Sequence, residues 1–177
     1  MRNKVIIALC ASSALAAHAA SSPDAPPDTC TLDYQIEPNW DETPRRFDVR
    51  MNFDVDAKGE ATLLGPKSWG GVEDFDKTII AVRVLGDGVS LQFVESNQWQ
   101  INQSASVGKR VTVRYRIVNG VATIDEDTPI YQPNFHRNTL GNSHFQLIGH
   151  GALVGPRHLA NSCNRVTCIT FSGLPDG

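Results

Sequence analysis

Five histidines are the residues of this chain that could hold a catalytic metal ion. They are His18, His136, His144, His150 and His158. Zinc-dependent hydrolysis often uses H-E-x-x-H, which places two imidazoles on one helix face and a glutamate between them as general base. No histidine here is followed by glutamate, and the spacings fit no other zinc-ligand signature. We therefore expect no metal ion, no other cofactor and no metal-dependent catalysis.

The motifs of other catalytic chemistries are missing as well. G-x-S-x-G, which presents a nucleophilic serine on a strand-to-helix turn, does not occur in the sequence. A glycine-rich phosphate-binding loop does not occur either. A small hydrolase with a site of an unrecognised kind stays an alternative to which no residue can be assigned.

The polar and aromatic stretch 131–145 is the best candidate for a binding loop. It carries imidazoles and carboxamides at His136, Asn138, Asn142 and His144. Long loops in compact domains are often functional, so these side chains could hydrogen-bond a peptide. They could equally satisfy one another and the loop backbone. A second loop carries Trp69, which either presents its ring to a ligand or plugs one end of the fold.

The cysteines suggest a disulfide. Cys163 and Cys168 flank four residues and could pair locally, while Cys30 could instead pair with either of them and tie the amino-terminal arm to the last strand. Pairing is plausible only in an oxidising compartment, and the sequence cannot choose the connectivity. Our prediction is the local pair, Cys163 with Cys168.

The first nineteen residues have the features of a secretory signal peptide. Arg2 and Lys4 precede an apolar run, and Ala17-His18-Ala19 offers small residues where cleavage needs them. The run is shorter and more broken than the roughly 20 apolar residues of a membrane span. We therefore expect a periplasmic or secreted protein without a membrane span.

The rest of the chain divides into an arm and one domain. Residues 20–29 are rich in Pro, Ser and Asp and should form a flexible arm, and residues 30–177 have the size of a single domain. The formal net charge is −3, with signs mixed along the chain. No basic run indicates nucleic acid, and no basic amphipathic helix indicates a membrane surface.

Alternation of apolar and polar residues predicts strands. In 47–55 the odd positions are apolar and the even positions polar, which predicts a strand with one buried face. We expect 61–64 to return as its partner strand. Further strands are predicted over 79–85, 89–94, 99–101, 111–117, 121–124 and 166–171, with no more than a helical turn at 73–77. This pattern is typical of an all-β protein, an antiparallel β-sandwich.

Several short motifs, in this order, carry a resemblance to a known family. They are Tyr34-Gln35-Ile36, 47–53, Leu64-Gly65-Pro66, Trp69-Gly70-Gly71, Trp99-Gln100-Ile101, 111–117 and 140–145. From about Cys30 onward the chain resembles the amino-terminal β-domain of the glycyl aminopeptidase family of zinc metallopeptidases. The resemblance implies a β-sandwich that packs beside a catalytic domain. The zinc ligands and general base of that family have no counterpart here.

We therefore expect a secreted, non-catalytic β-sandwich module that acts through peptide or protein contacts, or as the part preceding a catalytic domain. Its partner would be a peptide, a protein or such a catalytic domain. One alternative is a sandwich that binds glycans or other ligands through exposed Trp69 and Trp99. The other is the small hydrolase named above.

Overall fold

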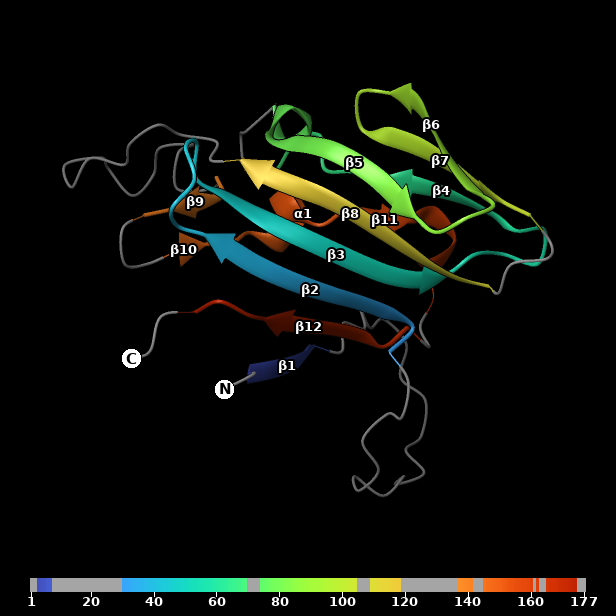
Figure 1. The fold of residues 1–177 in the computed structure, drawn as a ribbon, viewed down its shortest axis with the longest axis horizontal. Coiled ribbons are helices and arrows are strands. Elements are labelled where there is room, and N and C mark those ends of the chain that lie inside the picture. The colour runs from blue at the N-terminus through green and yellow to red at the C-terminus, as the bar shows by residue number, and fades with distance from the viewer. Residues whose placement is uncertain are drawn as a thin grey trace, which may run out of the picture.

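The computed structural model describes residues 3–7, 30–69, 74–104, 109–118, 137–141, 145–160, 162 and 165–174. Within them the regular secondary structure is almost entirely strands, packed as two main sheets (Figure 1). The predicted all-β sandwich is confirmed. Helical structure is limited there to α1 (Gly149–Ala152) and to 3₁₀ turns at Phe75–Thr78 and Arg157–Leu159. No helix in the described part of the chain is long and apolar enough to cross a membrane.

The larger sheet has six strands. In spatial order they are β1 (Asn3–Ile7), β12 (Thr167–Phe171), β2 (Leu32–Asn39), β3 (Arg46–Asp54), β8 (Arg110–Val118) and β5 (Ile79–Leu85). All neighbours are antiparallel except β12 and β2, which are parallel. Strand β1 belongs to the segment predicted as a signal peptide, and it occupies the outer edge of β12.

The second sheet has four strands and covers part of the first. Its order is β11 (Gly155–Pro156), β4 (Glu60–Leu64), β7 (Gln98–Gln103) and β6 (Val89–Glu95). A two-stranded sheet of β9 (Thr139–Leu140) and β10 (Phe145–Gln146) lies at the left of Figure 1, by the end of β2 and the start of β3. Contact between the rings of Phe47 and Phe145, 5.7 Å apart, fixes this small sheet against β3.

Strand β4 does not pair with β3 as expected. It pairs with β7 and β11 in the opposite sheet. The turn between β3 and β4 contains Gly59 at φ +79°, and its carbonyl oxygen accepts a hydrogen bond from the Gln103 amide of β7, in the far sheet, at 2.8 Å. An added Cβ at Gly59 would lie 2.5 Å from the Gln103 carbonyl oxygen, so the turn needs glycine both for its φ and for this approach. The chain therefore crosses between sheets where the sequence indicated a hairpin.

Alternation on β3 places the core as predicted. Phe47, Val49, Met51 and Phe53 are almost fully buried, and Val55 just beyond the strand is buried as well. Inward residues of the neighbouring strands complete one hydrophobic cluster; they include Leu32, Tyr34, Ile36, Leu63, Ile101, Val111, Val113, Tyr115 and Ile117. Helical structure in the described residues is as scarce as the sequence predicted, because the core is supplied by strand faces.

Two buried tyrosines fasten the end of α1 and the segment after it to the large sheet. The Tyr34 hydroxyl donates to the Val154 carbonyl oxygen at 2.7 Å. The Tyr115 hydroxyl donates to the Ala152 carbonyl oxygen and accepts from the Val154 amide, both at 3.3 Å. Burial raises the pKa of both phenols well above the usual value near 10, because the interior disfavours the phenolate.

The predicted disulfide is wrong. Cys168 is bonded to Cys30, with 5.7 Å between the α-carbons, and Cys163 lies outside the described residues. The reason is the parallel pairing of β12 with β2, which brings the end of the chain beside its first core strand. The bridge closes a loop of 138 residues, for which the chain-entropy relation gives roughly 4–5 kcal/mol of stabilisation.

Burial of Val49 can be tested by introducing a charge. We expect Val49→Asp to lower the free energy of unfolding by about 3–4 kcal/mol, since it buries a carboxylate without a partner. The matched control is Gln92→Glu, which adds the same charge on an exposed position of β6 opposite the neutral Gln100 and should change stability by less than about 0.5 kcal/mol. Urea unfolding measures both. Equal free energies of unfolding for the two variants would show that Val49 on β3 does not face the core.

The raised phenol pKa values predict loss of stability at alkaline pH. The folded state keeps Tyr34 and Tyr115 protonated, whereas the unfolded chain loses these protons near pH 10. Their contribution is therefore complete below about pH 10 and declines as the pH rises further. Urea unfolding between about pH 8 and 11 should show this decline, and Tyr34→Phe should reduce its slope while costing about 1–2 kcal/mol at neutral pH. An unchanged slope in the variant would contradict the assignment.

Candidate functional site

The outward face of the large sheet carries polar side chains in rows that run across the strands. Register places each outward residue of β3 opposite one on β2 and one on β8. Directly opposed residues have Cβ atoms about 5 Å apart, so each row is a set of close neighbours. The rows differ in how many hydrogen bonds and ion pairs their members make with one another, and this difference identifies the candidate site.

The first row is internally satisfied. Asn52 donates to the Asp33 carboxylate at 3.1 Å and accepts from the Thr112 hydroxyl at 2.7 Å. The three side chains come from β3, β2 and β8, and together they form a hydrogen-bonded chain across the sheet. This row needs no ligand to complete it.

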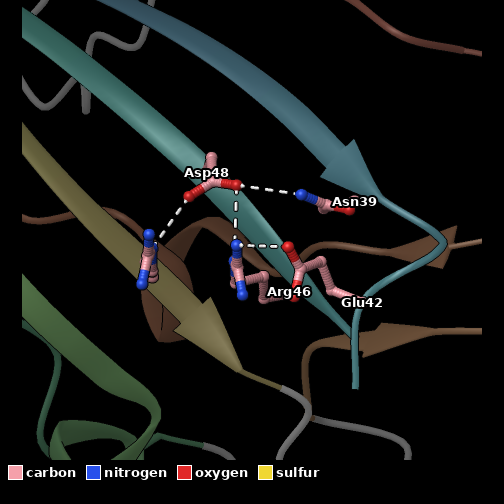
Figure 2. A network of polar contacts seen from close by, with 5 residues as sticks. Asn39, Glu42, Arg46 and Asp48 are labelled. Carbon is pink, nitrogen blue, oxygen red and sulfur yellow. Dashed lines mark hydrogen bonds and ion pairs between the residues drawn. The ribbon is translucent and has the colours of Figure 1, made fainter. Parts of the chain in front are cut away.

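The row centred on Asp48 is partly satisfied. Its carboxylate accepts from Arg116 at 3.1 Å, and from Arg46 and Asn39 at 3.4 Å each. Arg46 also pairs with Glu42 at 3.1 Å. Figure 2 shows Asp48 at the centre of this network, with Asn39 on one side and Arg46 beside Glu42. Glu37 lies opposite Asp48 on β2, so two acidic residues are neighbours there.

The row between these two is unsatisfied. Arg50 on β3 is opposite Arg114 on β8, and Arg114 is in turn opposite Arg83 on β5. We call Arg50, Arg83 and Arg114 the arginine row. Among the described residues none of the three makes an ion pair or a side-chain hydrogen bond. Like charges directly opposite one another destabilise a sheet, so the row has an energetic cost that no ion pair of its members offsets in the described structure.

A bulge in β5 brings Arg83 into the row. The register between β5 and β8 shifts between Ile80 and Arg83, and Ala81 in this bulge has φ +53°, which is unusual for a residue with a Cβ. In a regular ladder Val82 would lie opposite Arg114, and Arg83 would point to the core. The extra residue reverses this, so Arg83 stays outside and Val84 packs against the core.

The arginine row and the acidic pair line one hollow of about 510 Å³. Gln35, Ser172 and the bulge residue Ala81 also contribute to its wall. Tyr115 touches the floor, but its ring is 1% exposed and its hydroxyl points inward. The hollow therefore offers guanidinium groups, two carboxylates and neutral hydrogen-bonding groups, with no exposed aromatic ring among its described residues. Its chemistry suits a charged ligand held by hydrogen bonds.

Of the residues predicted for a binding loop, the structure describes Trp69 and Asn138. Asn138 is 1% exposed; it donates to the Gly151 carbonyl oxygen at 2.7 Å and accepts from the Ile148 amide at 2.9 Å. It therefore holds α1 in place and is not available to a ligand. Trp69 is 40% exposed and stacks on His150, which belongs to α1, with ring centroids 5.4 Å apart. His136, Asn142 and His144 lie outside the described residues.

The other two candidates, Trp99 and His158, contact neighbouring parts of the protein. Trp99 is 7% exposed and belongs to the core, so the expected glycan platform of two exposed tryptophans loses one member. The His158 ring lies 3.1 Å from the Asp54 carbonyl oxygen through Nε2. In the described part of the chain no three His, Cys, Asp or Glu side chains gather as a metal site would require.

Sequence reasoning missed the arginine row. A local signal existed, because Arg114 and Arg116 alternate with buried residues and must share one face of their strand. The sequence did not indicate that β3 and β5 flank β8, or that a bulge turns Arg83 outward. Both depend on pairing between distant segments.

Comparisons with known proteins give a limited result. No family model matches the chain, and no curated protein sequence matches it. Its structure is similar to that of an aminopeptidase N family protein from Idiomarina loihiensis, with 17% sequence identity and a TM-score of 0.54. The similarity covers 73% of this chain and 20% of that one, so it concerns about a fifth of the larger protein. At this identity the likeness shows a shared fold alone.

Proposed function

We propose that this chain is an exported, non-catalytic β-sandwich module that acts through peptide or protein contacts. The observation that carries the proposal is the structural likeness to one fifth of an aminopeptidase N family protein. It agrees with the resemblance found in the sequence motifs, which points to the domain beside the catalytic one. A module of this kind contributes a binding surface and leaves chemistry to another domain.

The composition of the hollow supports a binding role. Its polar side chains are arginines, carboxylates, Gln35 and Ser172, and among the described residues no histidine or cysteine lies in the wall to act with Ser172 as base or nucleophile. The strands that carry them are rigid, because each is hydrogen-bonded on both sides or held by the core beneath. Rigid, charged and concave surfaces suit recognition.

Export is supported by the disulfide and by the amino-terminal sequence. A bond between Cys30 and Cys168 persists in oxidising compartments such as the periplasm or the extracellular space. The first nineteen residues have the pattern of a cleaved signal peptide. After cleavage β12 would become the edge of the large sheet, and the described core would be retained because its first member is Leu32.

A second candidate function is ligand binding at Trp69. Its ring is 40% exposed and is held in place by stacking on His150. An oriented, exposed indole could stack on a sugar ring. Trp99 cannot contribute to this surface because it is buried.

The experiment uses protein purified from the periplasm, with its zinc content and its hydrolysis of aminoacyl anilides measured first. We expect less than stoichiometric zinc and no hydrolysis. The folded protein is then used to select from a displayed peptide library, and selected peptides are synthesised and titrated in solution. We expect saturable binding that is lost when the disulfide is reduced and the protein unfolded.

Two outcomes would overturn the proposal. Hydrolysis that depends on one tightly bound zinc would make the chain an enzyme. Binding on an oligosaccharide array that Trp69→Ala abolishes, with no peptide selected, would favour the glycan alternative. Trp99→Phe is not a useful control, because it alters the core.

A further inference from the structure

We propose that the arginine row is a subsite for the acidic side chains of an extended peptide, and that Glu37 at the same hollow receives a basic side chain. The choice of a peptide as the ligand rests on the proposed function. The charge pattern of the site is an observation that does not depend on that function. The ligand would be a segment with two acidic residues followed closely by a lysine or arginine.

The first argument is the cost of the row. Three guanidinium groups occupy directly opposed positions on neighbouring strands, without a carboxylate partner in the described part of the chain. The adjacent row shows that the same sheet can neutralise an arginine, because Asp48 pairs with Arg116. The bulge at Ala81 adds a third like charge where a regular strand would place Val82. A bound anion would remove the repulsion.

The second argument is geometry. Strands lie about 5 Å apart, so Arg50, Arg114 and Arg83 span roughly 10 Å across the sheet. In an extended peptide, side chains two residues apart lie on one side with a spacing of about 7 Å. Two carboxylates in the pattern Glu-x-Glu therefore fit between three guanidinium groups. The planar guanidinium binds a carboxylate through two parallel hydrogen bonds, which a lysine could not reproduce.

The third argument is the mixed charge of the hollow. Glu37 is exposed, lies opposite Asp48 and makes no ion pair among the described residues. A uniformly negative chain, such as a sulfated glycan or a nucleic acid, would be repelled at this end. The described residues of the wall also include no exposed aromatic ring on which a base or a sugar could stack. A peptide that carries both signs matches both ends.

The test is a fluorescence anisotropy titration with the disulfide-bonded protein at low salt. The probe is a labelled peptide, Ser-Glu-Ser-Glu-Ser-Lys-Ser, compared with one in which glutamine replaces both glutamates. Competitors are a heparin hexasaccharide and an all-glutamate peptide of the same length. We expect the mixed-charge probe to bind tightest, with affinity falling as salt is added.

Variants of the protein locate the binding. Arg114→Gln should weaken the probe about tenfold, and Arg114→Lys should restore only part of the loss. The control is Arg157→Gln, which removes the same charge from an exposed position outside this hollow and should change affinity by less than about twofold. The midpoint temperature of thermal unfolding should be equal or higher for Arg114→Gln than for the unaltered protein. Weaker binding by the variant then cannot be attributed to loss of the fold.

The outcomes separate this inference from the proposed function. Equal binding by Arg114→Gln and the unaltered protein would overturn the subsite, even if library-selected peptides bind elsewhere. Tightest binding of heparin, strengthened by Glu37→Gln, would overturn the peptide and assign the row to a uniform polyanion. Zinc-dependent hydrolysis would refute the proposed function alone, because it leaves the anisotropy result unaffected.

Discussion

The structure depends on the position of β3 between β2 and β8. Both pairings run the length of β3 without a break in register, so its two faces are fixed along the whole strand. A shift of one residue would exchange the faces and put Asp48 and Arg50 into the core. The inward face supplies Phe47, Val49 and Met51 to the core, and the same register sets the polar rows on the outward face.

The two faces of this sheet have opposite effects on stability. The inward face buries large apolar side chains, each worth about 1.5–3 kcal/mol when fully buried. The outward face includes like charges whose repulsion costs a few tenths to about 1 kcal/mol per pair. The stabilisation by the core is much larger than this cost, so the fold can carry the arginine row. The Cys30–Cys168 bridge and the two buried tyrosines add to that margin.

The sequence predicted what local pattern determines and missed what distant pairing determines. Alternation located β3, β8 and the class of fold, because a period of two is a property of one strand. It could not place β4 in the opposite sheet, since the turn at Gly59 looks like a hairpin until Gln103 is known to lie beside it. The wrong disulfide has the same origin: only the parallel pairing of β12 and β2 brings Cys30 to Cys168. The arginine row was not predicted for the same reason, because it is formed by pairing between strands that are distant in the sequence.

The central claim is that the arginines of neighbouring strands repel one another across a sheet whose register is fixed. A double-mutant cycle with Arg50→Gln and Arg114→Gln measures this directly through the free energy of unfolding. The account predicts that the two substitutions together stabilise less than the sum of their separate effects, by about 0.2–1 kcal/mol at low salt. The coupling should largely vanish at about 1 M salt, where the screening length is near 3 Å. Additive effects at low salt, or a coupling of the opposite sign, would contradict the account.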